Sequence, residues 1–114
     1  MAKIYIAGKI TGNPNYKEEF GVWEKRLADE GFTVVSPVYH DKYEGDYSDV
    51  DAVWNHYMRI SIAKLTECDE IFMLPGWQRS KGANVERMIA GWLSLPIHYG
   101  VINGLEPRQT ATQD

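Results

Sequence analysis

Cysteine is nearly absent from this sequence of 114 residues, and long apolar runs are absent altogether. The single cysteine, Cys68, cannot form a disulfide within the chain. Its place at the start of an apolar run is typical of a small core residue rather than of a nucleophile. No stretch has the pattern of a signal peptide or the roughly 18 apolar residues of a membrane span. We therefore expect a cytoplasmic protein without a membrane partner.

An excess of basic charge is also missing. The chain has 12 Lys and Arg against 16 Asp and Glu, which gives a formal net charge of -4 at pH 7. Proteins that bind nucleic acid in bulk need a basic face that displaces counterions from the phosphates. The charge balance argues against such a partner, while a small anionic ligand held by a few local donors is compatible with it.

Motifs for metals and common cofactors are missing as well. The three histidines belong neither to an HExxH motif nor to a Cys/His pattern. In the polar stretch HDKYEGDYSDVD, residues 40–51, the acidic residues Asp46, Asp49 and Asp51 lack the spacing, the central glycine and the terminal glutamate of an EF-hand loop, and we expect the stretch to be a surface excursion. The dinucleotide fingerprint GxGxxG and the Walker motif do not occur. We expect neither a metal nor a cofactor.

What the sequence does contain is enough apolar material for one core. Hydrophobic residues make up 44% of the chain and aromatic residues 12%, a composition typical of globular proteins. A length of 114 residues falls in the commonest size range of single domains. We expect one domain at residues 1–102 and a flexible C-terminal tail at residues 103–114, where apolar residues are scarce.

Two periods of apolar residues alternate along the chain. Runs rich in β-branched and aromatic residues predict buried strands at residues 3–7, 32–37, 70–75 and 97–102. Apolar residues spaced three and four apart predict helices from Tyr16 to a stop at Gly31, over residues 52–67, and from the early 80s to Leu95. The alternation predicts an α/β fold, a three-layer flavodoxin- or Rossmann-like parallel sheet of four or five strands with helices on both faces.

The fold indicates where a ligand would bind. In open parallel sheets, ligands bind beyond the carboxyl ends of the strands, where the strand order reverses. If the order is 2-1-3-4, this point lies between the first and third strands. These strands end in the loops AGKITG (residues 7–12) and GWQRSKGANVE (residues 76–86). We expect these two loops to form the pocket.

The second loop contains groups suited to a phosphate. The amino terminus of a helix presents free N–H groups and the positive end of its dipole. Ser80 adds a hydroxyl, Arg79 and Lys81 add charge, and Gly82 allows the backbone to approach a ligand closely. The alternative is that Ser80 only caps the helix and that the basic side chains are solvated.

Glu86 is the candidate reactive group. It lies about one turn into the predicted third helix, next to apolar residues. A glutamate near the start of a helix usually faces water and complements the dipole. At the reversal point, however, it would point into the crevice, where a carboxylate could attack the anomeric carbon of a sugar.

Other polar and aromatic residues admit two interpretations. Asp69 lies before the third strand. It either has a structural role, capping the preceding helix turn or lying at the sheet edge, or it holds a base or sugar hydroxyl. Trp54 and Tyr57 on the predicted second helix are either packing residues or a lid over the cleft.

The order of these motifs resembles a known family. The segments KIYIAGKITG, YMRISIAKLTECDEIFMLPGW and RSKGANVE are similar to the nucleoside 2-deoxyribosyltransferase-like superfamily, and most similar to a small branch common in bacteriophage genomes. The resemblance covers residues 3–99. It implies a retaining attack on 2′-deoxyribosyl N-glycosides, in the host cytoplasm if a phage encodes the chain. It also implies a homo-oligomer whose neighbouring subunits help to close the pocket.

The resemblance implies roles for individual residues. Glu86 matches the family's nucleophile, and Tyr5 matches the tyrosine that hydrogen-bonds it. Ser80 matches the serine that binds the 5′-phosphate in related deoxynucleotide N-hydrolases. Asp69 is the candidate for a catalytic aspartate. The residues expected to contact the substrate are Gly8, Lys9, Ile10, Thr11, Gly12, Ser61, Gly76, Trp77, Arg79, Ser80 and Gly82.

Two residues depart from the family pattern. Ser61 stands where relatives commonly carry an aspartate that contacts or helps to protonate the base, and Lys9 replaces a proline or serine. A serine is no general acid at neutral pH. The resemblance therefore implies an N-glycosidase of 2′-deoxynucleoside 5′-monophosphates or nucleosides, with water or a second base as acceptor. The alternative is an inactive nucleotide-binding or host-interaction module on the same fold.

Overall fold

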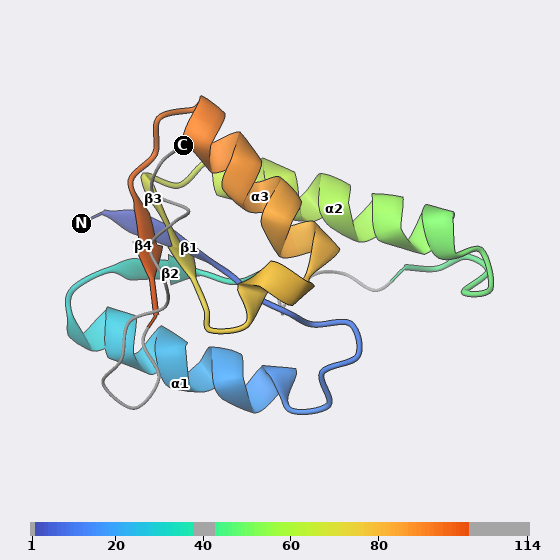
Figure 1. Ribbon diagram of the computed structural model, residues 1–114, viewed down its shortest axis with the longest axis horizontal. Helices are drawn as coiled ribbons and strands as arrows, with labels where there is room; N and C mark the ends of the chain where they lie inside the picture. Colours follow the sequence, from blue (N-terminus) through green and yellow to red (C-terminus); the bar gives the residue numbers. More distant parts are fainter. Residues whose placement is uncertain (1, 38–42, 101–114) are drawn as a thin grey trace.

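The computed structural model describes residues 2–37 and 43–100, which form a four-stranded parallel sheet between two layers of helices (Figure 1). The order of the strands is β2-β1-β3-β4, which confirms the predicted fold. The central strands pair with Tyr5 opposite Ile71 and Ala7 opposite Met73. The strands are β1 (Lys3–Ala7), β2 (Thr33–Val35), β3 (Glu70–Met73) and β4 (Ile97–Tyr99).

The central strand β1 is buried on both faces because its side chains alternate between the two helical layers. Ile4 and Ile6 pack in one cluster with residues of α1 (Tyr16–Asp29). Tyr5 and Ala7 point to the other face, into a second cluster with residues of the remaining helices. A tyrosine on this strand is therefore presented to the layer that carries Glu86.

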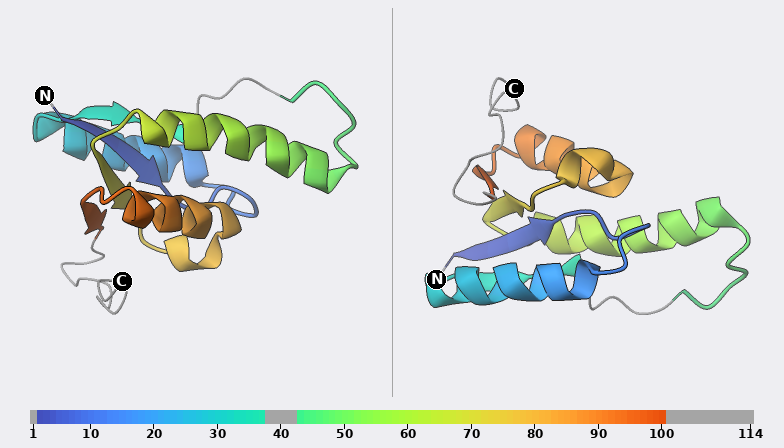
Figure 2. Two further views of the ribbon diagram at one scale, coloured as in Figure 1. Left: turned by 90° about the horizontal axis from the view of Figure 1, so that it is seen from above. Right: turned by 60° about the horizontal axis from the view of Figure 1, so that its bottom comes forward.

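Helix α1 covers one face of the sheet, and α2 (Val50–Thr66) and α3 (Lys81–Trp92) cover the other (Figures 1 and 2). Gly31 follows α1 with a φ of 101°, a left-handed conformation that suits glycine and ends the helix as predicted. Helix α2 begins two residues before the predicted Ala52, because the carboxylate of Asp49 accepts a hydrogen bond from the Ala52 N–H at 3.1 Å.

The buried face of α3 differs from the prediction. The spacing of apolar residues places Val85, Met88, Ile89 and Trp92 on one face of this helix. Ile89 packs against the core, whereas Met88 and Trp92 are 47% and 81% exposed. The buried residues are Ala83, Glu86 and Ala90, and the small ones let α3 approach the sheet and α2 closely. The prediction for this face was therefore wrong for Met88 and Trp92.

Several other predictions have clear outcomes. Cys68 is buried, and burial raises its pKa to about 11, as suits a core residue. Strand β2 is shorter than predicted, and β3 ends at Met73. Residues 101 and 102 of the predicted fourth strand, the predicted tail at residues 103–114 and residues 40–42 of the polar stretch lie outside the described residues.

In the described residues, no helix is both long and apolar enough to span a bilayer. In the same residues, no three His, Cys, Asp or Glu side chains gather as a metal site.

Candidate active site

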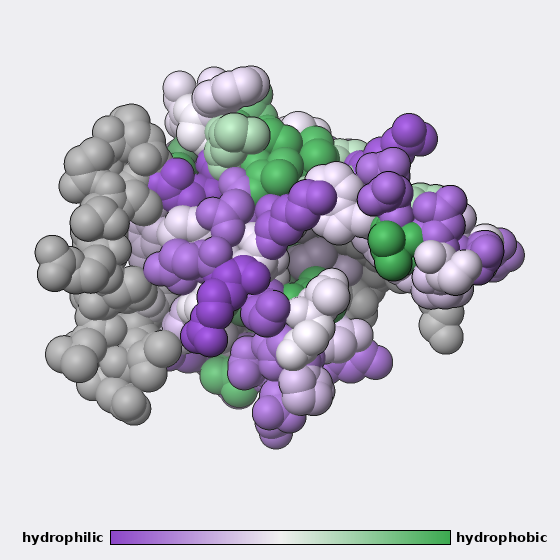
Figure 3. Space-filling view, turned by 45° about the vertical axis from the view of Figure 1, so that its right-hand side comes forward, coloured by the Kyte–Doolittle hydropathy of each residue, from purple (hydrophilic) through white to green (hydrophobic). Residues whose placement is uncertain are grey.

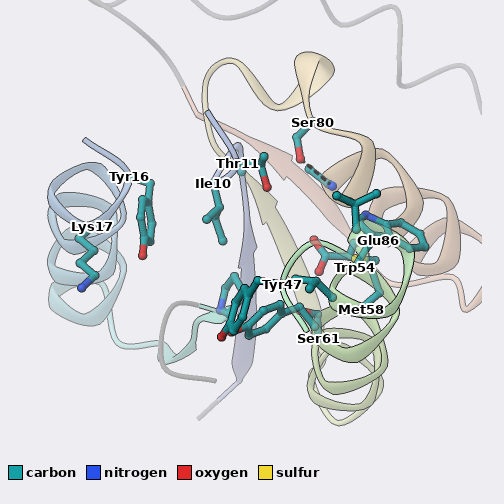
Figure 4. Close-up of a pocket in the computed structure, with 17 residues that line it drawn as sticks. Ile10, Thr11, Tyr16, Lys17, Tyr47, Trp54, Met58, Ser61, Ser80 and Glu86 are labelled. Carbon is teal, nitrogen blue, oxygen red and sulfur yellow. Dashed lines mark hydrogen bonds between the residues drawn. The ribbon is translucent and has the colours of Figure 1, made fainter. Parts of the chain in front are cut away.

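A cavity of about 640 Å³ opens at the carboxyl ends of β1 and β3. The strand order reverses there, because the chain leaves β1 towards α1 and leaves β3 towards α3 on the opposite face. From the side of these strand ends, the surface is hollowed within a mainly hydrophilic rim (Figure 3). Among described residues, the lining consists of Gly8, Ile10, Thr11, Tyr16, Lys17, Pro37, Tyr47, Val50, Val53, Trp54, Tyr57, Met58, Ser61, Ser80, Gly82, Ala83 and Glu86 (Figure 4).

Glu86 lies in the wall of this cavity and is only 5% exposed. The Tyr5 hydroxyl donates a hydrogen bond of 2.7 Å to Glu86 Oε2, so the contact implied by the resemblance is present. Ser61 is buried and lines the same cavity. Burial raises the pKa of Glu86 to about 7, although the hydroxyl groups of Tyr5 and Ser61 act in the opposite direction. The carboxylate therefore changes its charge near neutral pH.

Tyr5 supports Glu86 from beneath. Its side chain is fully buried and does not line the cavity. Burial, followed by the nearby Glu86 charge, raises the Tyr5 pKa well above its ordinary value. The phenol therefore stays protonated at neutral pH and serves as a hydrogen-bond donor.

Ser80 both caps α3 and lines the cavity. Its Oγ accepts a hydrogen bond from the Ala83 N–H at 3.1 Å and thereby caps α3. The same residue lines the cavity. Gly82 lies beside it, and a Cβ at that position would come within 3.1 Å of Met58 Sδ. A glycine at this position therefore keeps the cavity open between α2 and α3.

The first loop contributes only part of its expected residues. Gly8, Ile10 and Thr11 line the cavity, whereas Lys9 and Gly12 do not. Gly8 is needed for packing, because a Cβ there would lie 3.1 Å from Leu74 and crowd the core. The Lys9 carbonyl accepts a hydrogen bond from the side chain of Asn13, which holds the turn.

Asp69 requires a correction. It lies at the amino end of the sheet, away from the cavity, where its carboxylate accepts a hydrogen bond of 2.8 Å from the Lys3 N–H. The Asp69 N–H in turn donates to the Lys3 carbonyl. Asp69 therefore fixes the start of β1, and the prediction of a catalytic role for it was wrong.

Three residues of the second loop also lie outside the lining of the cavity. Trp77 is buried in the core, where its ring packs against Tyr99. Gly76 has a φ of 88° and begins the short helix η2 (Trp77–Arg79), so its role is in the turn. Arg79 is exposed at the end of η2. These residues shape the loop and do not line the cavity.

Comparison with known proteins gives a family for the chain. The model of the family described as "Domain of unknown function (DUF4406)" matches residues 2–99. The chain belongs to this family.

A solved structure with the same fold is a 2-deoxyribosyltransferase from the psychrotolerant bacterium Bacillus psychrosaccharolyticus. The two structures align with a TM-score of 0.67 over 90% of this chain and 77% of the other, at 21% sequence identity. None of the curated proteins matches the chain. The structural likeness establishes the fold of this DUF4406 member.

One wall of the cavity was predicted only in part, since Val50, Val53 and Met58 were missed. It is the face of α2 made by Val50, Val53, Trp54, Tyr57, Met58 and Ser61, all of which line the cavity. Their spacing of three, one, three, one and three residues is that of one helical face, so the signal was present. Trp54 and Tyr57, considered as packing residues or a lid, thus belong to the wall.

Aromatic contacts hold the outer part of this wall. The Tyr57 hydroxyl accepts a hydrogen bond of 3.1 Å from the Tyr43 N–H, and the Tyr43 ring packs edge-on against Tyr47. These contacts hold residues 43–47 near the rim of the cavity. The Lys81 ammonium lies 4.2 Å from the centre of the Trp54 ring, a cation–π distance.

The arrangement of charge in the cavity is simple. Among the lining residues that the structure describes, Glu86 is the one carboxylate and Lys17 the one Lys or Arg. Figure 4 shows Glu86 beside α2 and Lys17 on α1, across the cavity. A carboxylate that ionises near neutral pH in a pocket lined in part by aromatic residues is suited to stabilise or attack an electron-poor carbon.

Proposed function

We propose that this chain is an N-glycosidase of 2′-deoxynucleoside 5′-monophosphates or nucleosides. The observation that carries the proposal is the buried carboxylate of Glu86, hydrogen-bonded by Tyr5 in the wall of a nucleotide-sized cavity. The fold shared with a 2-deoxyribosyltransferase supports the same reaction class.

In the proposed reaction, ionised Glu86 attacks C1′ of the sugar. A bond forms between the carboxylate oxygen and C1′, while the bond from C1′ to the base nitrogen breaks and its electron pair leaves with the base. The base takes a proton from solvent. Water or a second base then displaces Glu86 from C1′, so the configuration at this carbon is retained. Tyr5 keeps the carboxylate aimed and stabilises its charge.

The walls of the cavity support a nucleotide as the ligand. Trp54 and Tyr57 offer aromatic surfaces on which a base can stack. Ser80 and the first N–H groups of α3 provide donors for a 5′-phosphate. Arg79 and Lys9, which were expected to help, lie outside the lining, and Lys17 is the cation that reaches it.

A second candidate function is that of a nucleotide-binding or host-interaction module without turnover. Glycosidases generally use two carboxylates, one of which protonates the leaving group. Ser61 occupies the position at which the resemblance implies an acid, and Glu86 is the one carboxylate in the described lining. In this case, nucleotides raise the thermal stability of the protein but no base is released.

The test is to incubate the protein with each deoxynucleoside and each 5′-monophosphate and to measure free base by chromatography. We expect base release by the wild type and only background release by Glu86→Gln. Glu67→Gln, an exposed glutamate at the end of α2, is the matched control and should retain full activity. Equal activity of Glu86→Gln and the control would exclude Glu86 as nucleophile.

The proposal also covers the oligomeric state of the protein and its relation to the bacteriophage branch of the superfamily. We propose a homo-oligomer, on the resemblance and on the exposed Trp92 of α3. Two other aromatic residues that could serve an interface have partners within the chain, since Trp23 packs against Phe72 and Tyr99 accepts a hydrogen bond from Arg87. The link to the bacteriophage branch rests on the resemblance alone.

A further inference from the structure

Ser61 is one of three buried polar or charged residues in the described chain, with Ser36 and Glu86. Its side chain is on the cavity face of α2 and is 4% exposed. Burial of a hydroxyl is unfavourable unless the group is hydrogen-bonded. That two of the three buried polar residues meet at one point indicates that Ser61 is kept there by its contact with Glu86.

Ser61 and Glu86 line the same cavity, and the Ser61 hydroxyl lowers the pKa of both Glu86 and Tyr5, as a hydroxyl that donates to either group would. A hydroxyl has one proton, so it donates to only one of them at a time. Donation to Glu86 stabilises the carboxylate directly. Donation to the Tyr5 oxygen polarises the phenol and strengthens its hydrogen bond to Glu86 Oε2. Both arrangements favour ionised Glu86.

We propose that Ser61 is a positioning residue, which orients the carboxylate of Glu86 from α2 as Tyr5 does from β1. The inference rests on the proposed function and changes the role expected for Ser61, from contact with the base to action through the nucleophile. The other titratable groups that line the cavity around Glu86 are Tyr57 on α2, Tyr16 and Lys17 on α1, and Tyr47 near the rim.

A purely structural role is the competing account. Serines inside helices often donate to a carbonyl one turn earlier in their own helix. Such a bond would leave the ionisation of Glu86 unchanged when the hydroxyl is removed. Thr66 provides the matched example in α2, since its hydroxyl donates to the Ala63 carbonyl at 2.9 Å.

The experiment is a ¹³C NMR titration of the Glu86 side-chain carboxyl, assigned by the loss of its signal in Glu86→Gln. We expect Ser61→Ala to raise the titration midpoint by roughly half a unit to one unit, the equivalent of one hydrogen bond. Ser61→Thr, which keeps the hydroxyl, should restore the wild-type midpoint, and Thr66→Ala should not change it. If Ser61→Ala does not fold, Ser61→Cys keeps the volume with a weaker donor.

An unchanged midpoint in Ser61→Ala, or in Ser61→Cys if the alanine variant does not fold, overturns the inference, whether or not the wild type releases base. If the midpoint shifts but the wild type shows no turnover, the proposed activity fails while the positioning of Glu86 by Ser61 stands. If the wild type is active, the pH at which its rate is half-maximal should shift in Ser61→Ala by the same amount as the NMR midpoint.

Discussion

Glu86 loses much of its contact with water on folding. Its burial should make the stability of the protein depend on pH. Burial raises its pKa from an ordinary 4.5 to about 7, so the folded state binds a proton that the unfolded state has lost between these values. The contribution of Glu86 to stability is therefore most favourable below about pH 4.5. It declines as the pH rises and stays low above about pH 7.

Glu86→Gln should remove this dependence, because an amide does not titrate. We expect the variant to be more stable than the wild type at pH 8, by up to about 3 kcal/mol, and similar in stability at pH 4. Urea unfolding at both pH values measures the difference. A stability difference that is the same at both pH values contradicts the buried ionisation of Glu86.

At the scale of single residues, the reactive pair near the strand ends was predicted. Glu86 was identified from its place in the chain and from the resemblance, and Tyr5 from the resemblance. The structure contains their hydrogen bond. Asp69 was misplaced because a polar residue beside a strand can lie at either end of the sheet, and only its pairing with Lys3 shows which. Trp77 was misplaced because its neighbours in the loop are polar, while its ring enters the core.

At the scale of elements, the start of α3 combines a helix cap with a candidate ligand site. Ser80→Ala removes the acceptor for the Ala83 N–H and should lower the free energy of unfolding by about 1 kcal/mol. Ser80→Asp keeps a good capping acceptor, so we expect near-wild-type stability. Its negative charge should nevertheless weaken binding of a 5′-monophosphate more than binding of the nucleoside.

Thermal unfolding and calorimetric titration with both ligands separate these two effects. If Ser80→Asp binds the monophosphate and the nucleoside with unchanged relative affinity, Ser80 acts only as a cap.

The cavity face of α2 should determine how the base is held. Removing the indole of Trp54 by substitution with Ala should weaken binding of deoxynucleoside 5′-monophosphates by roughly 5- to 100-fold, since aromatic stacking contributes about 1–3 kcal/mol per base. Val22→Ala, an exposed apolar residue of α1 outside the described lining of the cavity, is the control and should leave the affinity unchanged. Equal affinities of both variants, measured by calorimetry, would remove Trp54 from the binding surface.

The elements differ in how far their faces could be predicted. The three- and four-residue spacing located all three helices, but the face of α3 was misjudged because it packs through Ala83 and Ala90. A helix face predicted from hydrophobic spacing is chosen by its large apolar side chains. Helices that pack closely bury small side chains instead. For Trp54 and Tyr57 on α2 the spacing left packing and a lid open as alternatives, and only the position of α2 above the strand ends shows that its face borders a cavity.

At the scale of the whole molecule, the alternation of strands and helices was sufficient to predict the parallel sheet, and the structure has the strand order that was assumed for it. Parallel strands with right-handed crossovers leave few arrangements for four strands. The size of the cavity was not predictable, because it depends on how far residues 43–49 and the start of α2 extend beyond the sheet.

The exposed Trp92 at the end of α3 leads to a prediction about assembly. Its side chain is 81% exposed, with Leu93 also exposed beside it. We expect the protein to self-associate at micromolar concentration and Trp92→Glu to be smaller in solution, because a charge in an apolar contact is unfavourable. Light scattering after gel filtration measures both masses. Identical masses for wild type and variant would place any interface elsewhere.

The central claim is that Glu86 forms a covalent bond to the sugar during turnover. Its most direct test is to quench the protein with acid during reaction with a deoxynucleotide and to analyse its peptides by mass spectrometry. The account predicts an added deoxyribosyl phosphate on the peptide that contains Glu86, and no such addition in Glu86→Gln. Base release at the wild-type rate by Glu86→Gln, with no adduct on that peptide in either protein, would contradict it.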